Sequence, residues 1–208
     1  MKIRITLLVL CLALSALATE VSLEPLKDAC VCDCAPGANN PIGPEYLGQG
    51  RYSNCYTRTF IQWDMNEIPD GATIDSAIFR IYVGQFYGSP SGEMAYYRVI
   101  EDWNENTITY LNMPDYTDTG AVFLSNWPGS GTWHTIDVTD SVVAWYDSTI
   151  DNYGLYCHSR NSTSTSDCMY ASSRYPTHSL RPELVVNYSG GSEVQEETWG
   201  SIKEGFDE

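Results

Sequence analysis

Basic residues and histidines are scarce in this sequence. Lys and Arg together number 11 against 27 Asp and Glu, and there are 3 histidines in 208 residues. The formal net charge of −16 repels phosphate backbones, which argues against nucleic acid as a partner. The sequence also lacks a Walker loop, a His-Glu-x-x-His motif, a Gly-x-Ser-x-Gly elbow and a dinucleotide fingerprint. No motif selects a carboxylate pair for glycoside hydrolysis either. We therefore predict no catalytic residues.

Long hydrophobic runs are missing too, except at the start of the chain. Lys2 and Arg4 precede a mainly apolar stretch at 5–17, and Ala16-Leu17-Ala18 has the small-x-small form of a cleavage site. This is the layout of an export signal, and the apolar stretch is too short for a stable membrane span. We interpret 1–18 as a signal peptide, and expect a secreted or extracellular-surface protein without a transmembrane segment.

The cysteines of the mature chain indicate disulfides. The sequence has seven cysteines, and six remain once Cys11 is removed with the predicted signal peptide. An even number is typical of bonded cysteines in exported proteins. Cys157 and Cys168 lie on two predicted strands joined by a polar loop, and we predict a bond between them across a hairpin. Cys55 is expected to pair with one member of a triplet that the sequence does not resolve further, Cys30, Cys32 or Cys34. A four-thiolate metal site of the triplet and Cys55 is the alternative, although its spacing is unlike that of a zinc knuckle.

Short alternating segments separated by Gly, Pro, Asn and Ser dominate the mature chain. The clearest predicted strand is 73–83, in which Ala77, Phe79, Ile81 and Val83 share one face. Further strands are predicted at 56–64, 94–100, 132–138, 154–159, 168–173 and 182–188. One short helix is expected from Thr139 or Asp140 to about Tyr146. This pattern predicts an all-β fold, a jelly-roll β-sandwich with one short helix.

The composition divides the chain into four parts. We expect the signal peptide to be followed by a short leader at 19–27, a single domain at 28–188 and an acidic, flexible tail at 189–208. The tail would carry one apolar stripe if it became helical. We hypothesise that it docks to a protein partner, and a merely solubilising tail is the alternative.

Several blocks match one known family in the family's order. They are RTFIQWD (58–64), IPDGATIDSA (68–77), DWNENTITY (102–110), TWHTIDVT (132–139), NYGL (152–155), ASSR (171–174) and PELVVNY (182–188). In these blocks the chain resembles the DNRLRE domain family, which is also described as carbohydrate-binding module family 96-like and is related to the disaggregatase repeat. The resemblance implies a jelly-roll β-sandwich of exported proteins and a role in polysaccharide binding. The chain departs from the family pattern at Tyr110, where the family usually has Trp, and in its Cys-x-Cys-x-Cys triplet.

Sugar binding requires an aromatic surface and a few planar polar groups. Loop aromatics could provide the surface, namely Phe86, Tyr87, Tyr116, Trp127, Tyr153 and Tyr175. Arg160 and Arg174 could provide forked donors. Arg174 matches a family position and adjoins Tyr175, so we predict a ligand site at this pair, formed with the segment 153–160. By contrast, we interpret Trp63, Trp103 and Trp145 as core residues.

The sequence therefore favours a secreted, non-catalytic module that binds an extracellular polysaccharide. The alternative is a structural subunit of an extracellular matrix, appendage or cell envelope. No cofactor is firmly implied, although Asp and Asn side chains and carbonyls in the loops could hold a structural calcium ion.

Overall fold

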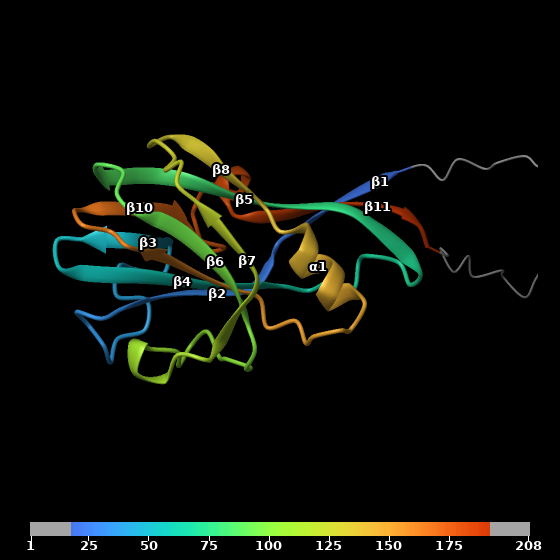
Figure 1. Ribbon diagram of the computed structural model, residues 1–208, viewed down its shortest axis with the longest axis horizontal. Helices are drawn as coiled ribbons and strands as arrows, with labels where there is room; N and C mark the ends of the chain where they lie inside the picture. Colours follow the sequence, from blue (N-terminus) through green and yellow to red (C-terminus); the bar gives the residue numbers. More distant parts are fainter. Residues whose placement is uncertain (1–17, 192–208) are drawn as a thin grey trace, which may run out of the picture.

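The computed structural model describes residues 18–191, which fold into an 11-stranded sheet with one α-helix (Figure 1). The strands are β1 (Thr19–Leu23), β2 (Pro25–Cys32), β3 (Tyr46–Tyr52), β4 (Cys55–Trp63), β5 (Ala72–Gly88), β6 (Glu93–Val99), β7 (Tyr116–Leu124), β8 (Thr132–Asp137), β9 (Leu155–Arg160), β10 (Ser166–Ala171) and β11 (Glu183–Gly190). The helix is α1 (Thr139–Tyr146), and two short 3-10 turns are η1 (Tyr110–Asn112) and η2 (His178–Leu180).

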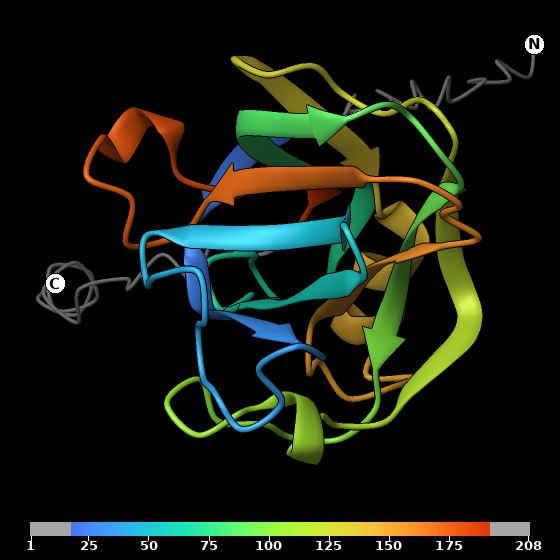
Figure 2. The same cartoon turned by 90° about the vertical axis from the view of Figure 1, so that its left-hand side faces the viewer.

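The strands form one curled antiparallel sheet. Its order is β1-β11-β5-β10-β3-β4-β9-β6-β7, with β2 paired to β4 and β8 paired to β5. Figure 2 shows β5, β10, β3 and β4 stacked one above another, with β6 and β7 across from them. The sheet thus curls around its own core, and the expected all-β sandwich with a single helix is confirmed.

The main core follows from the period-2 pattern of β5. Ala77, Phe79, Ile81 and Val83 are all buried in it, because alternate side chains of a strand point to one face. Trp63 lies edge-on against Phe79, with ring centroids 4.9 Å apart. A second cluster, which includes Trp103, lies apart from this core. Trp63, Trp103 and Trp145 are all buried, which supports their interpretation as core residues.

The segment 19–27, expected to be a leader, belongs to the sheet. Thr19 of β1 pairs with Tyr188 of β11, Leu23 pairs with Leu184, and β2 begins at Pro25. The sequence pattern is hard to recognise because β1 has just five residues and mostly exposed side chains. The predicted signal peptide, apart from Ala18, and the tail beyond residue 191 lie outside the described residues.

The structure resolves the pairing of Cys55. Its partner is Cys34, and the two Cα atoms are 5.4 Å apart. The register of β2 and β4 explains the choice. Cys30 pairs with Thr59 and Cys32 with Thr57, so the same register places Cys34 directly opposite Cys55.

The predicted bond between Cys157 and Cys168 is wrong. Both thiols are free and buried in the core. Strand β9, which carries Cys157, pairs with β4 and β6, whereas β10, which carries Cys168, pairs with β3 and β5. The two strands are therefore consecutive in sequence without being neighbours in the sheet, and the loop between them crosses the fold instead of closing a hairpin.

A buried histidine predicts acid sensitivity. His134 is 4 % exposed, its Nδ1 lies 3.2 Å from the Tyr96 hydroxyl, and burial lowers its pKa to about 4. The unfolded chain would protonate this histidine near pH 6.5, so folding stability falls as the pH drops from about 6.5 to 4, by about 3 kcal/mol. Burial raises the pKa of Asp167 to about 6, which has the opposite sign and offsets part of the loss.

We therefore expect His134→Gln to lose less stability than the wild type between pH 7 and pH 4.5. Urea unfolding at both pH values measures the difference. Asp167 remains in both proteins, so its contribution cancels. An identical acid dependence in the two proteins would contradict the assignment to His134.

Candidate functional site

Aromatic and arginine side chains gather on the face of β4, β9, β6 and β7 that points away from the main core. On β9, Leu155 and Cys157 enter the main core, whereas Tyr156, His158 and Arg160 alternate with them. On the neighbouring strand β6, Tyr97 pairs with Tyr156 and therefore lies on the same face of the sheet. We call this surface the tyrosine–arginine face. It comprises Tyr56, Arg58, Tyr97, Tyr110, Tyr116, Phe123, Tyr156, His158 and Arg160.

Buried rings support exposed rings on this face. Tyr156 stacks on Tyr97 at 5.8 Å between ring centroids, and both are buried. Tyr116 lies over the pair, with centroids 4.8 Å from Tyr97 and 4.7 Å from Tyr156, and Phe123 lies edge-on to Tyr97 at 5.8 Å. Tyr116 is 46 % exposed and Phe123 is 40 % exposed. The outer rings are thus held in place before any ligand arrives.

Two arginines are fixed against these rings. The Arg58 guanidinium lies 4.8 Å from the Tyr110 ring centroid, and an Nη atom is 3.6 Å from a carboxylate oxygen of Asp33. The Arg160 guanidinium lies 4.1 Å from the Phe123 centroid and donates to Glu93 at 2.9 Å. Each arginine is therefore oriented by a ring and paired with an acid.

The protonation states of the face are set by burial and by Arg58. Burial raises the pKa of Tyr156 above its ordinary value, so its hydroxyl keeps its proton. Burial, followed by the nearby Arg58 charge, lowers the pKa of His158 to about 4. His158 is consequently neutral at physiological pH, and the formal positive charges of the face belong to its arginines.

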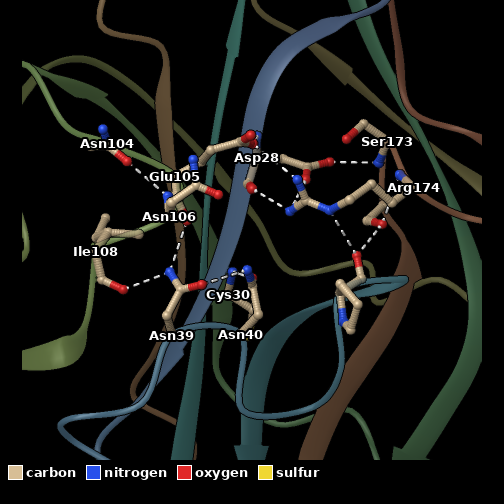
Figure 3. Close-up of polar contacts among 12 residues, drawn as sticks. Asp28, Cys30, Asn39, Asn40, Asn104, Glu105, Asn106, Ile108, Ser173 and Arg174 are labelled. Carbon is tan, nitrogen blue, oxygen red and sulfur yellow. Dashed lines mark hydrogen bonds and ion pairs between the residues drawn. The ribbon is translucent and has the colours of Figure 1, made fainter.

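A polar network holds the loop that carries Tyr110 in place (Figure 3). The Asn39 Nδ2 atom donates to the carbonyl oxygens of Glu105 and Ile108, both at 2.8 Å, and the neighbouring Asn40 side chain accepts from the Cys30 amide at 2.8 Å. These bonds connect the loop after β2 to the segment that leads into η1. Tyr110, the first residue of η1, is in this way held beside Arg58.

Arg174, the leading predicted ligand residue, is part of this network (Figure 3). Its Nη2 atom donates to the Asp28 carbonyl at 3.1 Å and faces the Asp28 carboxylate at 3.4 Å, while Nη1 donates to Glu105 at 3.1 Å. Its Nε atom lies 3.4 Å from the Pro44 carbonyl. Asp28 is fully buried, and this desolvation raises its pKa, while the Ser173 amide and Arg174 act in the opposite direction. Arg174 therefore connects three segments of the fold.

The other predicted ligand residues are dispersed. Tyr175 lies edge-on to Tyr46 at 5.9 Å, and the Tyr153 carbonyl accepts from the Trp103 indole at 2.9 Å. Tyr153 and Arg174 both contact the segment 103–105. Arg160 ends β9, whereas Tyr153 precedes its start, so the two residues lie at opposite ends of this strand.

Tyr87 and Trp127 lie at two further places. Tyr87 is edge-on to Tyr52 at 5.4 Å, beside a cavity of about 310 Å³. Trp127 packs on Phe86 and donates from its indole nitrogen to the Gly92 carbonyl at 3.2 Å. Of the eight candidate ligand residues, Tyr116 and Arg160 belong to the tyrosine–arginine face, and Tyr116 lies on β7 instead of in a loop. The remaining members of the face sit largely on strands, where the alternation of Tyr156, His158 and Arg160 was the available signal.

Possible metal ligands gather at one corner of the described chain. The Sγ atoms of Cys32, Cys34 and Cys55 lie within 4.8 Å of one another, but the bond between Cys34 and Cys55 removes two of these thiols from a four-thiolate site. Sulfur ligands do not suit calcium, which prefers oxygen. The structural calcium ion stays a prediction.

The curled sandwich and its aromatic, arginine-bearing outer face define the class of a β-sandwich binding module. Comparison with family models makes the assignment specific: the chain belongs to carbohydrate-binding module family 96, whose model matches residues 19–188. The match starts where β1 starts, which agrees with the inclusion of 19–27 in the domain. No curated protein matches the chain. Within residues 18–191, no helix has the length and hydropathy needed to cross a membrane.

Proposed function

We propose that the protein is an exported, non-catalytic module that binds an extracellular polysaccharide on the tyrosine–arginine face. The observation that carries this proposal is the pair of exposed rings, Tyr116 and Phe123, held by the buried Tyr97 and Tyr156. Rings of this kind contact the C–H faces of sugars without losing rotamer freedom on binding. Membership of a carbohydrate-binding module family supports the same ligand class.

An exposed arginine, Arg160, adds oriented donors to the apolar surface. Because Arg58 lies beside Asp33 and Arg160 is bonded to Glu93, their charges are largely balanced locally. Arg160, whose side chain is 42 % exposed, offers N–H donors in fixed directions to hydroxyl oxygens, whereas Arg58 is buried and holds Tyr110 beside it. The four strands span about 14 Å across the sheet, the width of a short oligosaccharide. We therefore expect binding that depends on ring contact and tolerates moderate salt.

Affinity electrophoresis through gels that contain a panel of neutral and anionic polysaccharides tests the proposal. The double variant Tyr116→Ala/Phe123→Ala should weaken the retention of the wild type by at least about tenfold, since each ring contact contributes about 1 kcal/mol. Tyr52→Ala is the matched control, because Tyr52 is also a strand-borne aromatic and is 54 % exposed. Equal retention of the double variant and the wild type would contradict the site. Large assemblies without retention on any polysaccharide would favour a structural subunit instead.

A further inference from the structure

A free thiol lies beside the disulfide of this protein. The Sγ atom of Cys32 is within 4.8 Å of the sulfurs of both Cys34 and Cys55, and it accepts the backbone N–H of Cys34 at 3.4 Å. Cys32 is 8 % exposed and unbonded, whereas Cys34 and Cys55 are joined. Three sulfurs at this spacing place a nucleophile next to the bond that it can attack.

The corner is also open to small molecules. Cys32 and Cys55 line the cavity of about 310 Å³ that Tyr52 and Tyr87 flank. The reactivity of a cysteine depends on access as well as on its thiolate. A small thiol-reactive compound can therefore approach these sulfurs without unfolding of the core.

We propose that Cys32, Cys34 and Cys55 form a thiol–disulfide exchange site. The Cys32 thiol releases its proton to water, and its thiolate attacks the Sγ atom of Cys55. The bond from Cys55 to Cys34 breaks, a bond from Cys55 to Cys32 forms, and Cys34 leaves as a thiolate that takes a proton from water. The step involves no net oxidation or reduction. The released Cys34 is then the thiol that reacts with external disulfides or electrophiles of low molecular weight.

The strand register determines which disulfide dominates. Cys34 is directly opposite Cys55, whereas Cys32 is its diagonal neighbour in the same register. Diagonal Cα atoms lie about 7–8 Å apart, beyond the usual span of a disulfide, so the exchanged bond requires a shift of the β3–β4 hairpin. The exchanged form is therefore a minor state, and it accumulates when Cys34 is captured.

Exchange also affects the tyrosine–arginine face. Asp33 lies between the two exchanging cysteines, its carboxylate accepts the Tyr56 amide at 2.8 Å, and it is the acid beside Arg58. Releasing Cys34 from Cys55 frees this turn and removes the partner of Arg58. This coupling rests on the proposed function, whereas the exchange itself does not.

Alkylation of the native full-length protein with N-ethylmaleimide, followed by non-reducing tryptic mapping, tests the exchange. Residues 28–51 carry the triplet and residues 52–58 carry Cys55, and fragmentation assigns the labelled cysteine. We expect the label on Cys34 together with a Cys32–Cys55 bond, at a rate that rises with pH because the thiolate is the nucleophile. In Cys32→Ser, Cys34 should remain unlabelled over the same period.

The buried Cys157 and Cys168 serve as internal controls for unfolding and should stay unlabelled. Three results would overturn the proposal: no label on Cys34 in the wild type, equal labelling of Cys34 in Cys32→Ser, or label on Cys32 with the original disulfide intact. The coupling is read separately, as the change in polysaccharide retention after labelling. A polysaccharide panel without any hits would leave the mapping result unaffected.

Discussion

Gly154→Ala should lower the melting temperature by about 10 °C and weaken polysaccharide retention as well. Gly154 precedes β9 and has a φ of +84°, a conformation that costs other residues about 1 kcal/mol. A Cβ atom at this position would also collide with the Ile61 backbone carbonyl of β4, which adds about 2–3 kcal/mol. A loss of about 3–4 kcal/mol corresponds to this shift in a domain of this size. The displaced strand carries Tyr156 and Arg160, so the face should be disturbed too.

Substitutions of two other glycines distinguish the conformational cost from the cost of the steric collision. Gly129→Ala meets no atom within 4 Å and has no positive φ, so it should leave the melting temperature nearly unchanged. Gly71→Ala has a φ of +76° in open space and should show the conformational cost alone. Calorimetry measures the melting temperatures of the three variants and so ranks their losses of stability. A loss for Gly154→Ala no larger than that for Gly71→Ala would disprove the collision.

Arg174→Ala should destabilise the protein by about 2 kcal/mol, or about 6 °C in melting temperature. The substitution removes the cation from beside the fully buried Asp28 carboxylate and separates three segments that Arg174 joins. The value is below that of a fully buried pair because the Arg174 side chain is 37 % exposed. Retention measured well below the melting temperature tests the predicted ligand role of Arg174 separately.

Arg80→Ala is the matched control for this prediction. The Arg80 side chain is 38 % exposed and pairs with Glu183 on the surface, so its loss should cost less than about 1 kcal/mol. Asp28→Asn completes a double-mutant cycle. Because the two residues interact, their effects on stability should be less than additive. Additive effects, or equal losses in the two arginine variants, would show that Arg174 does not support Asp28.

The sequence predicted the parts of the fold that have a strong local pattern. The alternation at 73–83 identified β5, and the polar start and apolar side of 139–146 identified α1. It did not reveal β3, which contains Gly48 and Gly50. The structure needs glycine there because a Cβ on Gly48 would lie 2.7 Å from the Thr57 side chain of β4. Close strand packing of this kind is set by distant residues and leaves no periodic signal.

The site was predicted less well than the fold, for a related reason. The sequence indicated loop aromatics as candidates, whereas Tyr97 and Tyr156 lie on strands and meet through their register. Three of the expected loop aromatics, Phe86, Tyr87 and Tyr116, also lie on strands. Arg174 next to Tyr175 suggested a free donor, but its partner Asp28 lies 146 residues away along the chain. The predicted bond between Cys157 and Cys168 was wrong for the same reason, because the order of strands in the sheet depends on distant parts of the chain. Local sequence thus indicates which residue types form the site, but it does not indicate which residues contact one another in the fold.

The pairing of β1 with β11 has a consequence for protein architecture. Thr19 and Tyr188, which bound the family match, are direct cross-strand partners, so their Cα atoms are about 5 Å apart. Figure 1 shows β1 and β11 side by side. A domain whose first and last strands are adjacent can be inserted into a surface loop of another protein without stretching either connection. The same adjacency suits circular permutation. Both ends of the module can therefore be connected to neighbouring positions of a single loop in another protein.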